Sequence, residues 1–558
     1  MQNMINRCVV LAAFAVAFPV VSHAQTTWTW DGGGGADFFS HWNNWQGDSF
    51  NGSGSSSDTL AFAGGTRLTP NNDLAAWADW KSILFNSGAS SFTITGNQID
   101  LFDTGGNGKI ENNSSVLQSF NVSSFSVNSG TYEFNPVSGS LTLGGGGFIY
   151  NNSNFIDVFG NGGHTLTIGK DLTGTGGLAV KQNSIVEYTT ASTYSGDTFI
   201  EGGQVRVAQG GSIANTTIRV GNTSGSQTAG LFISDMDGGT SIGNTVVIRS
   251  GTSGTRTVGG LNTSGNNTYS GPVSFDGDGT LYSAAGGTVT FSGVVADGAG
   301  GGSFTATIDG GGTVVFSGAS ANSGNSGMAG YVINSGTTLQ LNKTAGTAAI
   351  DANTTVNGTL QLLAANQITD SRNVTVNSGG TFNLNGNNET INSLTLAAGG
   401  NLSLGTGQLI LDNQAAGVVA GAISGSAGGS IVKKGANTVS ITGNNSGMAG
   451  DWYVVGGIVG FNHNNAAGSG TIYLGETFGS DAATIDISSA GVNLGTAIEV
   501  RSGSGGNKTI DNASGGTITF SGGVTLDATA YISANGSELS VFSGGLSGSG
   551  GIIKQGDG

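Results

Sequence analysis

The 558-residue sequence is poor in charge and in proline, and each shortage is informative. Charged residues make up 9% of the chain, and 17 Lys and Arg against 34 Asp and Glu give a net charge of −17 at pH 7. Nucleic-acid binding needs clustered basic side chains to meet the phosphates, so we expect no nucleic-acid partner. Only 4 prolines occur. A strand-rich chain avoids proline, because proline lacks the N–H that a sheet ladder requires.

Cysteine and histidine are also scarce. The single cysteine, Cys8, lies in an N-terminal segment that we expect to be removed, so the mature chain should contain neither disulfide nor thiol. Beyond His23 in that segment, the histidines are His41, His164 and His463, whose spacing does not suit a metal site. We therefore predict no catalytic residue, no cofactor-binding residue, no metal ligand and no cofactor.

Long hydrophobic runs are absent apart from one near the N-terminus. Arg7 precedes the apolar stretch Cys8–Val21, and Ser22–Ala24 offers small residues at the positions that a signal peptidase reads. The alternative is a buried N-terminal strand or helix. The stretch is shorter than the roughly 20 apolar residues that cross a bilayer, and no later run approaches that length. We expect residues 1–24 to be a signal peptide, no transmembrane segment in this sequence, and a secreted or cell-surface protein.

Repetition and alternation are what the chain has in abundance. The hexapeptide NSGMAG occurs at Asn325–Gly330 and again at Asn445–Gly450, each time between runs in which apolar residues alternate with Thr, Ser or Asn. Such alternation over roughly 4 to 8 residues is typical of half-buried strands. In the run Thr517–Ser521 it predicts that Ile518 and Phe520 point inward and that the threonines point outward.

The strand pattern favours a solenoid over a row of sandwich domains. Sandwich domains would be joined by linkers, and no Pro-rich or charged linker occurs. Gly-Gly, Ser-Gly and Asn-Gly pairs separate the runs and tolerate the positive φ of tight corners. The sequence predicts an all-β, right-handed parallel β-helix (solenoid) of roughly 20 to 25 residues a coil and on the order of 100 Å long.

The residues that follow the expected cleavage site differ from the rest. Six of the 7 tryptophans lie between Trp28 and Trp80. Large aromatics beside small stackable coils fit a cap over the end of a solenoid, and the alternative is an aromatic platform that binds sugars. A helical period over Leu74–Leu84 predicts a short capping helix. We expect residues 25–91 to form an aromatic-rich N-terminal cap and residues 92–558 to form the solenoid.

Several segments share a recognisable order of motifs. LTGTGGLAVK at Leu172–Lys181 is followed by alternating residues and by ASTYSG at Ala191–Gly196. ISGSAGGSIVKKG, from Ile423, repeats the opening, and TWTWDGGGGADFFSHWNNW at 27–45 leads the mature chain. This order resembles the autotransporter-associated β-strand repeat of bacterial surface proteins, whose unit opens with G-x-G-G-L-x-K and continues with N-x-Y-S-G. The copies depart from the pattern in their uneven spacing.

The resemblance implies an exported bacterial surface or secreted β-helical repeat protein of the passenger type, structural or adhesin-like. Its expected partners are glycans, surfaces or other cells, met through the face of the rod. LSGSGGIIKQGDG at Leu546–Gly558 stops where the repeat unit of the family continues into strands. We therefore expect the sequence to be truncated there, with a translocator or anchor outside it.

A β-helical polysaccharide lyase or glycoside hydrolase is the alternative function. Inverting hydrolysis uses two carboxylates roughly 6.5 to 9.5 Å apart, which requires acids gathered on neighbouring coils. The densest acidic groups stand beside no Arg, Lys or His that resembles a catalytic set, and we therefore expect no enzymatic activity. These groups are Asp235 and Asp237, Asp276 and Asp278, and Asp481 and Asp486.

Overall fold

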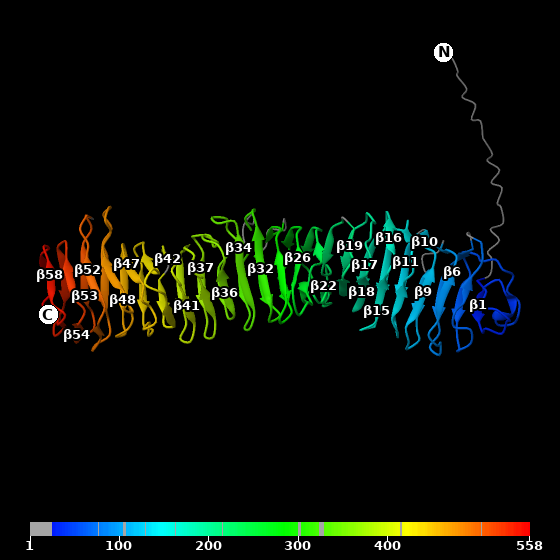
Figure 1. Ribbon diagram of the computed structural model, residues 1–558, viewed down its shortest axis with the longest axis horizontal. Helices are drawn as coiled ribbons and strands as arrows, with labels where there is room; N and C mark the ends of the chain where they lie inside the picture. Colours follow the sequence, from blue (N-terminus) through cyan, green and yellow to red (C-terminus); the bar gives the residue numbers. More distant parts are fainter. Residues whose placement is uncertain are drawn as a thin grey trace, which may run out of the picture.

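The computed structural model describes residues 25–75, 78–103, 108–128, 130–161, 163–214, 216–298, 303–322, 328–412, 416–503 and 505–558. The signal peptide predicted at residues 1–24 lies outside them. The described chain forms a long rod of about 21 stacked turns, with β1 (Thr27–Trp30) at one end and β58 (Leu546–Gly548) at the other (Figure 1). At about 4.8 Å a coil, the rod is roughly 100 Å long, as the sequence predicts.

Each coil passes three faces, and each strand pairs in parallel with the strand on the same face of the next coil. In one coil β5 (Ser82–Phe85) lies on the first face, β6 (Thr93–Gly96) on the second and β7 (Ile99–Phe102) on the third. The chain then returns to the first face, where β8 (Lys109–Asn112) pairs with β5. The second-face ladder continues along the rod to β59 (Ile552–Gln555). The predicted all-β parallel β-helix is confirmed.

The coils differ in length although their strands stay in register. Partners on the second face are 19 residues apart from Val186 to Val205 and 27 residues apart from Leu231 to Val258. The variation lies in the corners between strands, because the strands themselves must keep the alternation that buries one side. Coil length is therefore close to the predicted range but uneven.

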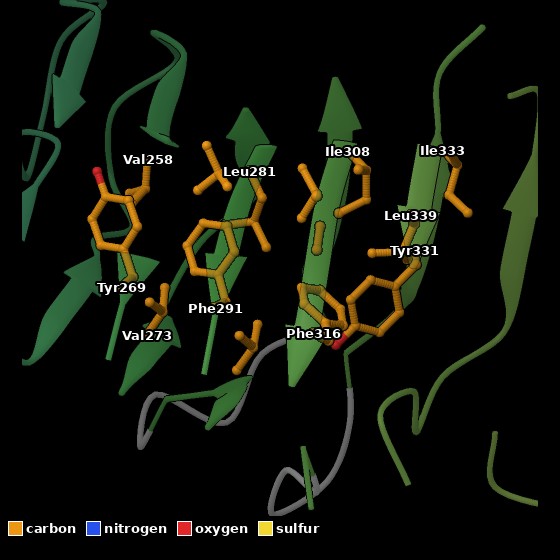
Figure 2. Packing of buried hydrophobic residues seen from close by; sticks show 14 of the residues in the cluster. Val258, Tyr269, Val273, Leu281, Phe291, Ile308, Phe316, Tyr331, Ile333 and Leu339 are labelled. Atoms are coloured by element: carbon orange, nitrogen blue, oxygen red, sulfur yellow. The ribbon is translucent and has the colours of Figure 1, made fainter. Parts of the chain in front are cut away.

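Inward side chains of successive coils form continuous columns in the core. Tyr269 and Phe291 stack with ring centroids 5.0 Å apart and an interplanar angle of 11°. Burying aromatic rings in such columns supplies much of the hydrophobic stabilisation of a rod whose coils touch only their neighbours. Figure 2 shows one aliphatic and one aromatic column, formed by Val258, Leu281, Ile308 and Ile333 and by Tyr269, Phe291, Phe316 and Tyr331.

Over three coils in the middle of the rod, none of the described residues on the first face forms a strand. Between β30 (Val295–Asp297) and β39 (Glu389–Ile391), side-chain oxygens replace ladder carbonyls. The Asn322 Oδ1 atom accepts the N–H of the first residue of β30 at 2.8 Å, and the Glu389 carboxylate accepts the N–H of Gln367 at 2.7 Å. Burial raises the pKa of Glu389 to about 8, even though three backbone N–H groups favour its ionised form.

The alternation predicted near the C-terminus is confirmed. In β54 (Thr517–Phe520), Ile518 and Phe520 are each 1% exposed, whereas Thr517 is exposed and Thr519 is half-buried. Val524 and Leu526 continue the buried side on the next strand. A period of two therefore identifies the inward residues wherever a strand has one buried face.

The short helix predicted over Leu74–Leu84 is wrong. Residues 76–77 lie outside the description, and β4 (Asp79–Trp80) and the start of β5 occupy the second half of the segment. Trp80 points into the core and lies in register with Leu101 of β7, so pairing with a neighbouring coil overrides the local helical period. Among the described residues, no helix is long and apolar enough to cross a membrane.

An aromatic cluster fills the core at the N-terminal end. Trp30 of β1, Phe39 and Trp45 are fully buried, with Trp30 and Trp45 edge to face at 5.2 Å. The Trp45 indole N–H donates to the Phe39 carbonyl at 2.8 Å, which satisfies the buried polar group. Buried rings cannot stack on a ligand, so these three residues close the core, whereas Phe38 and Trp42 of the same segment stay exposed at the surface.

The two copies of NSGMAG lie on different parts of the coil. The second copy leads into β47 (Asp451–Val454) on the first face, whereas the described end of the first copy, Met328–Gly330, leads into β33 (Gly330–Ile333) on the second face. Met328 and Met448 are both buried. The repeated hexapeptide therefore specifies a buried methionine before a strand, but it does not specify which face of the rod that strand joins.

Candidate functional site

Ion pairs and aromatic rings gather on the outer side of the first face, between β8 and β24 (Val246–Ile248). Elsewhere the outward positions are mostly Thr, Ser, Asn and Gln, as in β36 (Thr359–Leu362). Ligand-binding sites commonly combine aromatic side chains with a few polar or charged groups, so this surface is a candidate. The ion pairs are Lys109–Glu111 at 2.7 Å, Lys181–Asp157 at 2.7 Å, Arg219–Asp197 at 3.0 Å and Arg249–Glu201 at 4.0 Å.

A hollow of about 260 Å³ opens beside two neighbouring phenylalanines on this surface. Phe155 comes from β14 (Phe155–Phe159) and Phe199 from β19 (Thr198–Ile200), and their rings meet edge to face at 5.6 Å. Ala179 of β17 (Gly177–Lys181) lies between them, where its small side chain forms the floor. We call this the Phe155 hollow. Its remaining lining residues are Thr131, Asp157, Lys181 and Glu201.

Gly177 makes the shape of the Phe155 hollow possible. It lies in register with Phe155 on the neighbouring strand. A Cβ atom at this position would lie 2.5 Å from the Phe155 ring and would also collide with the carbonyl of Asp197. The absent side chain therefore lets the Phe155 ring lie over β17.

Each charge at the Phe155 hollow has a partner. The Lys181 ammonium forms an ion pair with Asp157 and lies 5.3 Å from the centre of the Phe159 ring. The guanidinium of Arg249 lies 5.5 Å from the Phe199 ring centre and 4.0 Å from the Glu201 carboxylate. Paired carboxylates and cations keep spare acceptor and donor positions while their net charge cancels. The hollow is thus suited to an uncharged ligand with many hydroxyl groups and one apolar side.

A second hollow of about 280 Å³ lies beside the first, around Phe159. Glu111 within it accepts bonds from the Lys109 ammonium at 2.7 Å and from the Asn113 amide at 2.8 Å. Burial alone would raise the pKa of Glu111, but these bonds outweigh it and hold the pKa below its usual value. We call this the Phe159 hollow. Its lining residues are Glu111, Glu133, Asn135, Val137, Phe159, Gly160, Asn161 and Gln182.

The acidic groups noted in the sequence serve local structure. A carboxylate oxygen of Asp235 accepts the Thr240 hydroxyl at 2.8 Å, and Asp278 accepts the N–H of Thr305 at 2.8 Å. Asp481 lines an open hollow of about 500 Å³ at the corner between the first and second faces. These contacts close turns and brace corners.

A different acidic pair forms on the second face. Asp486 of β50 (Ala483–Ile487) and Asp511 of β53 (Lys508–Asn512) lie in register on neighbouring strands. Burial raises the pKa of Asp486, and the nearby Asp511 charge adds to this effect, while a hydrogen bond with Ser488 opposes it. Sequence reasoning missed Asp511, because only the coil length relates the two positions. Over the described ranges, no group of three or more His, Cys, Asp or Glu is placed to hold a metal ion.

Comparisons with protein-family models, with curated proteins and with solved structures find no match. The resemblance to the autotransporter-associated repeat therefore depends on the sequence motifs, together with a β-solenoid that is consistent with a β-helical repeat protein.

Proposed function

We propose that this protein is an exported bacterial surface or secreted β-helical rod of the passenger type, adhesin-like and without catalytic activity, which binds saccharide chains along its first face. The Phe155 hollow is the observation that supports this proposal. Two outward phenylalanines enclose it, and paired charges surround its rim. Outward aromatic pairs lie elsewhere on the rod as well, as with Tyr453 and Tyr473, but here the pair adjoins a hollow and two ion pairs.

The chemistry of a sugar ring matches this hollow. One side of a pyranose presents C–H groups, which pack against aromatic rings, and its edge presents hydroxyl groups that both donate and accept hydrogen bonds. Phe155 and Phe199 supply the aromatic contacts. Asp157 and Glu201 can accept from hydroxyls, and Lys181 can donate to them. A chain of sugars along the rod would engage several coils at once.

A binding experiment tests the proposal. The purified protein is immobilised and exposed to a mixture of neutral, acidic and amino polysaccharides, and depletion from the mixture is measured. We expect a saccharide to be retained and Phe199→Ala to weaken its binding about tenfold, the usual cost of a lost aromatic contact. Phe148→Ala is the matched control, because Phe148 is 44% exposed on the third face of a nearby coil. No retention, or equal loss from both variants, would overturn the proposal.

A polysaccharide-cleaving enzyme is the second candidate, and the Asp486–Asp511 pair favours it. Retaining glycosidases place two carboxyl groups about 5 to 5.5 Å apart, which is close to the ~4.8 Å spacing of neighbouring strands. The same polysaccharides should therefore be assayed for new reducing ends and for unsaturated products. We expect none. Turnover that disappears in Asp486→Asn would establish the enzyme and contradict the adhesin proposal.

Export is a separate part of the proposal. Residues 1–24 carry the order of a signal peptide, so the exported protein should begin at Gln25. N-terminal sequencing of protein recovered outside the cytoplasm measures this directly. Recovery of exported protein that retains Met1 would contradict it.

A further inference from the structure

A further hollow, of about 370 Å³, lies on the second face of the coils that carry the first-face surface. Gly203 and Gly230 form part of its floor, Phe232 forms a wall, and the side chains of Gln204 and Thr257 stand at its rim. No charged side chain lines it. We call it the Phe232 hollow. Its chemistry is that of a site for an uncharged polar ligand with an apolar side.

A glycine on the middle one of three neighbouring strands creates the Phe232 hollow. Gln204 of β20 (Gly203–Val207), Gly230 of β22 (Ala229–Ile233) and Thr257 of β25 (Arg256–Gly260) form one outward column in register. A Cβ atom at Gly230 would collide with the Phe232 ring, so the ring can lie against the strand only because residue 230 is a glycine. The outward column then has no side chain between Gln204 and Thr257. The hollow is therefore a gap in a row of outward side chains.

Arg206 fixes the polar rim of this hollow. Its Nε and one terminal nitrogen donate to the side-chain oxygen Oε1 of Gln204 at 3.0 and 2.8 Å. This fork holds the carboxamide in one orientation and occupies its acceptor, so the amide nitrogen remains as the donor for a ligand. A preorganised donor beside an apolar wall lowers the entropic cost of binding.

Three consecutive residues join the three hollows. Lys181 lines the Phe155 hollow, Gln182 the Phe159 hollow and Asn183 the Phe232 hollow. Gln182 and Asn183 form the corner between β17 and β18 (Ser184–Tyr188), and both have left-handed φ angles, 52° and 59°. Left-handed backbone is costly for a residue such as glutamine, and strain of this kind concentrates at functional sites. The tight corner brings hollows on two faces to opposite sides of one edge.

We propose that the saccharide bound on the first face crosses the edge of the rod at Gln182–Asn183 and places an uncharged sugar unit in the Phe232 hollow. This inference rests on the proposed function, since it assumes a saccharide on the first face. It extends that function by requiring a saccharide long enough to bend over the edge of the rod. A short saccharide fills the first-face hollows alone. A longer one gains the contacts of Gln204 and Phe232 as well.

The test measures affinity against chain length, with neutral gluco-oligosaccharides of increasing size as probes. Thr257→Trp fills the Phe232 hollow, and Thr280→Trp is its matched control, since Thr280 lies in register with Thr257 one coil further on. For wild type we expect affinity to rise with length. In Thr257→Trp the gain from length should be lost, about tenfold, while binding of the shortest probes is unchanged. Thr280→Trp should resemble wild type.

The possible outcomes separate this inference from the proposed function. If Phe199→Ala weakens binding while Thr257→Trp behaves as Thr280→Trp does, the first-face site stands and the edge-crossing inference is overturned. If binding of long probes falls in Thr257→Trp and the shortest probes still depend on Phe199, both stand. If wild type binds none of the probes, the inference is overturned for neutral saccharides, and the depletion experiment with the wider mixture decides the proposed function.

Discussion

Two copies of one sequence motif, both on the first face, place their lysines on opposite sides of the sheet. In β17 the glycine pair is followed by Leu178 and Val180, which point inward, and Lys181 stays at the surface. In β45 (Ser430–Lys433) the first inward side chain, Ile431, comes one position later after the glycines, so Lys433, which stands as far from the glycines as Lys181 does, points inward. A shift of one residue in the alternation exchanges the two sides of a strand, so two similar sequences can expose one lysine and bury the other.

The inward lysine is held by backbone carbonyls. Lys433 is 0% exposed and lies in register between Leu411 and Val454 of the core. Its ammonium donates to the carbonyls of Lys434, of Gly435 at 2.9 Å and of Gly456 at 3.2 Å. Burial lowers the pKa of Lys433 to about 8, although the charge of Asp412 opposes the shift.

The corner after the strand explains the difference. Only Gln182 and Asn183 separate β17 from β18, whereas residues 434–437 separate β45 from β46 (Thr438–Ile441). The longer corner, with Gly435 at a φ of 69°, offers carbonyls to the end of the buried side chain. Lys343 is buried in the same way, with its ammonium on the Ser317 carbonyl at 2.8 Å. The motif therefore specifies a strand, and the corner that follows determines whether backbone carbonyls can hold a buried lysine ammonium.

The largest expected effect comes from moving a lysine into the core of the first copy. Val180 is 0% exposed between Val158 and Ile200, beside a corner that is two residues long. Val180→Lys would bury a charge without the carbonyls that Lys433 has, so we expect a loss of about 3 kcal/mol or more. Urea denaturation, with hydrogen exchange to locate the damage, measures it. Gln182→Lys adds the same charge at an exposed position and should cost little; equal losses would break the comparison.

The pH dependence of the second copy should be the next largest. Between pH 8 and pH 10 the folded chain loses the proton of Lys433 while the unfolded chain keeps it, so local stability rises with pH. The gain is up to about 3 kcal/mol, at about 1.4 kcal/mol for each pKa unit. Lys433→Met should remove it.

Hydrogen exchange of residues 430–460, compared between variant and wild type at each pH, measures this gain. Lys434→Met is the matched control, because Lys434 is exposed. Lys343 has a pKa lowered to about 8 by burial, so its own contribution should persist in both variants. A pH response that survives Lys433→Met around β45 would show that the carbonyl-held lysine is not the titrating group.

A smaller effect is expected at the longer corner itself. Gly435→Ala places a Cβ atom on a residue in the left-handed region, which costs roughly 1 kcal/mol. The loss should appear as local fraying of β45 and β46 in hydrogen exchange. Ala436→Gly, at the exposed neighbouring position, is the control. Equal protection in wild type and Gly435→Ala would mean that the corner does not need glycine.

The smallest stability effect should come from the surface lysine of the first copy. Lys181→Met removes the ion pair with Asp157. The Lys181 side chain is 29% exposed, and such surface pairs contribute about 0 to 1 kcal/mol to the free energy of unfolding. Thermal denaturation should hardly change, while saccharide binding at the Phe155 hollow should weaken. A large loss of stability would place Lys181 in the same structural role as Lys433.

The sequence alone determined the local structure of the rod. Alternation identified Ile518 and Phe520 as inward residues, because a strand with one buried face has a strict period of two. The tryptophans between Trp28 and Trp80 marked the end of the rod, since large aromatics in a chain of small residues fill the end of a core. These features depend only on residues close together in the chain.

Only the tertiary structure decided which residues of different coils meet. Strand partners on neighbouring coils are 19 residues apart from Val186 to Val205 but 32 apart from Thr27 to Thr59, so the register of Asp486 with Asp511 cannot be counted along the sequence. The helix expected over Leu74–Leu84 failed for the same reason, because pairing with adjacent coils outweighed a local period. The hollows, the inward position of Lys433 and the left-handed corner at Gln182 and Asn183 all depend on how the corners are built. Hydrogen bonding between coils fixes the strands in register and leaves the corners free to differ.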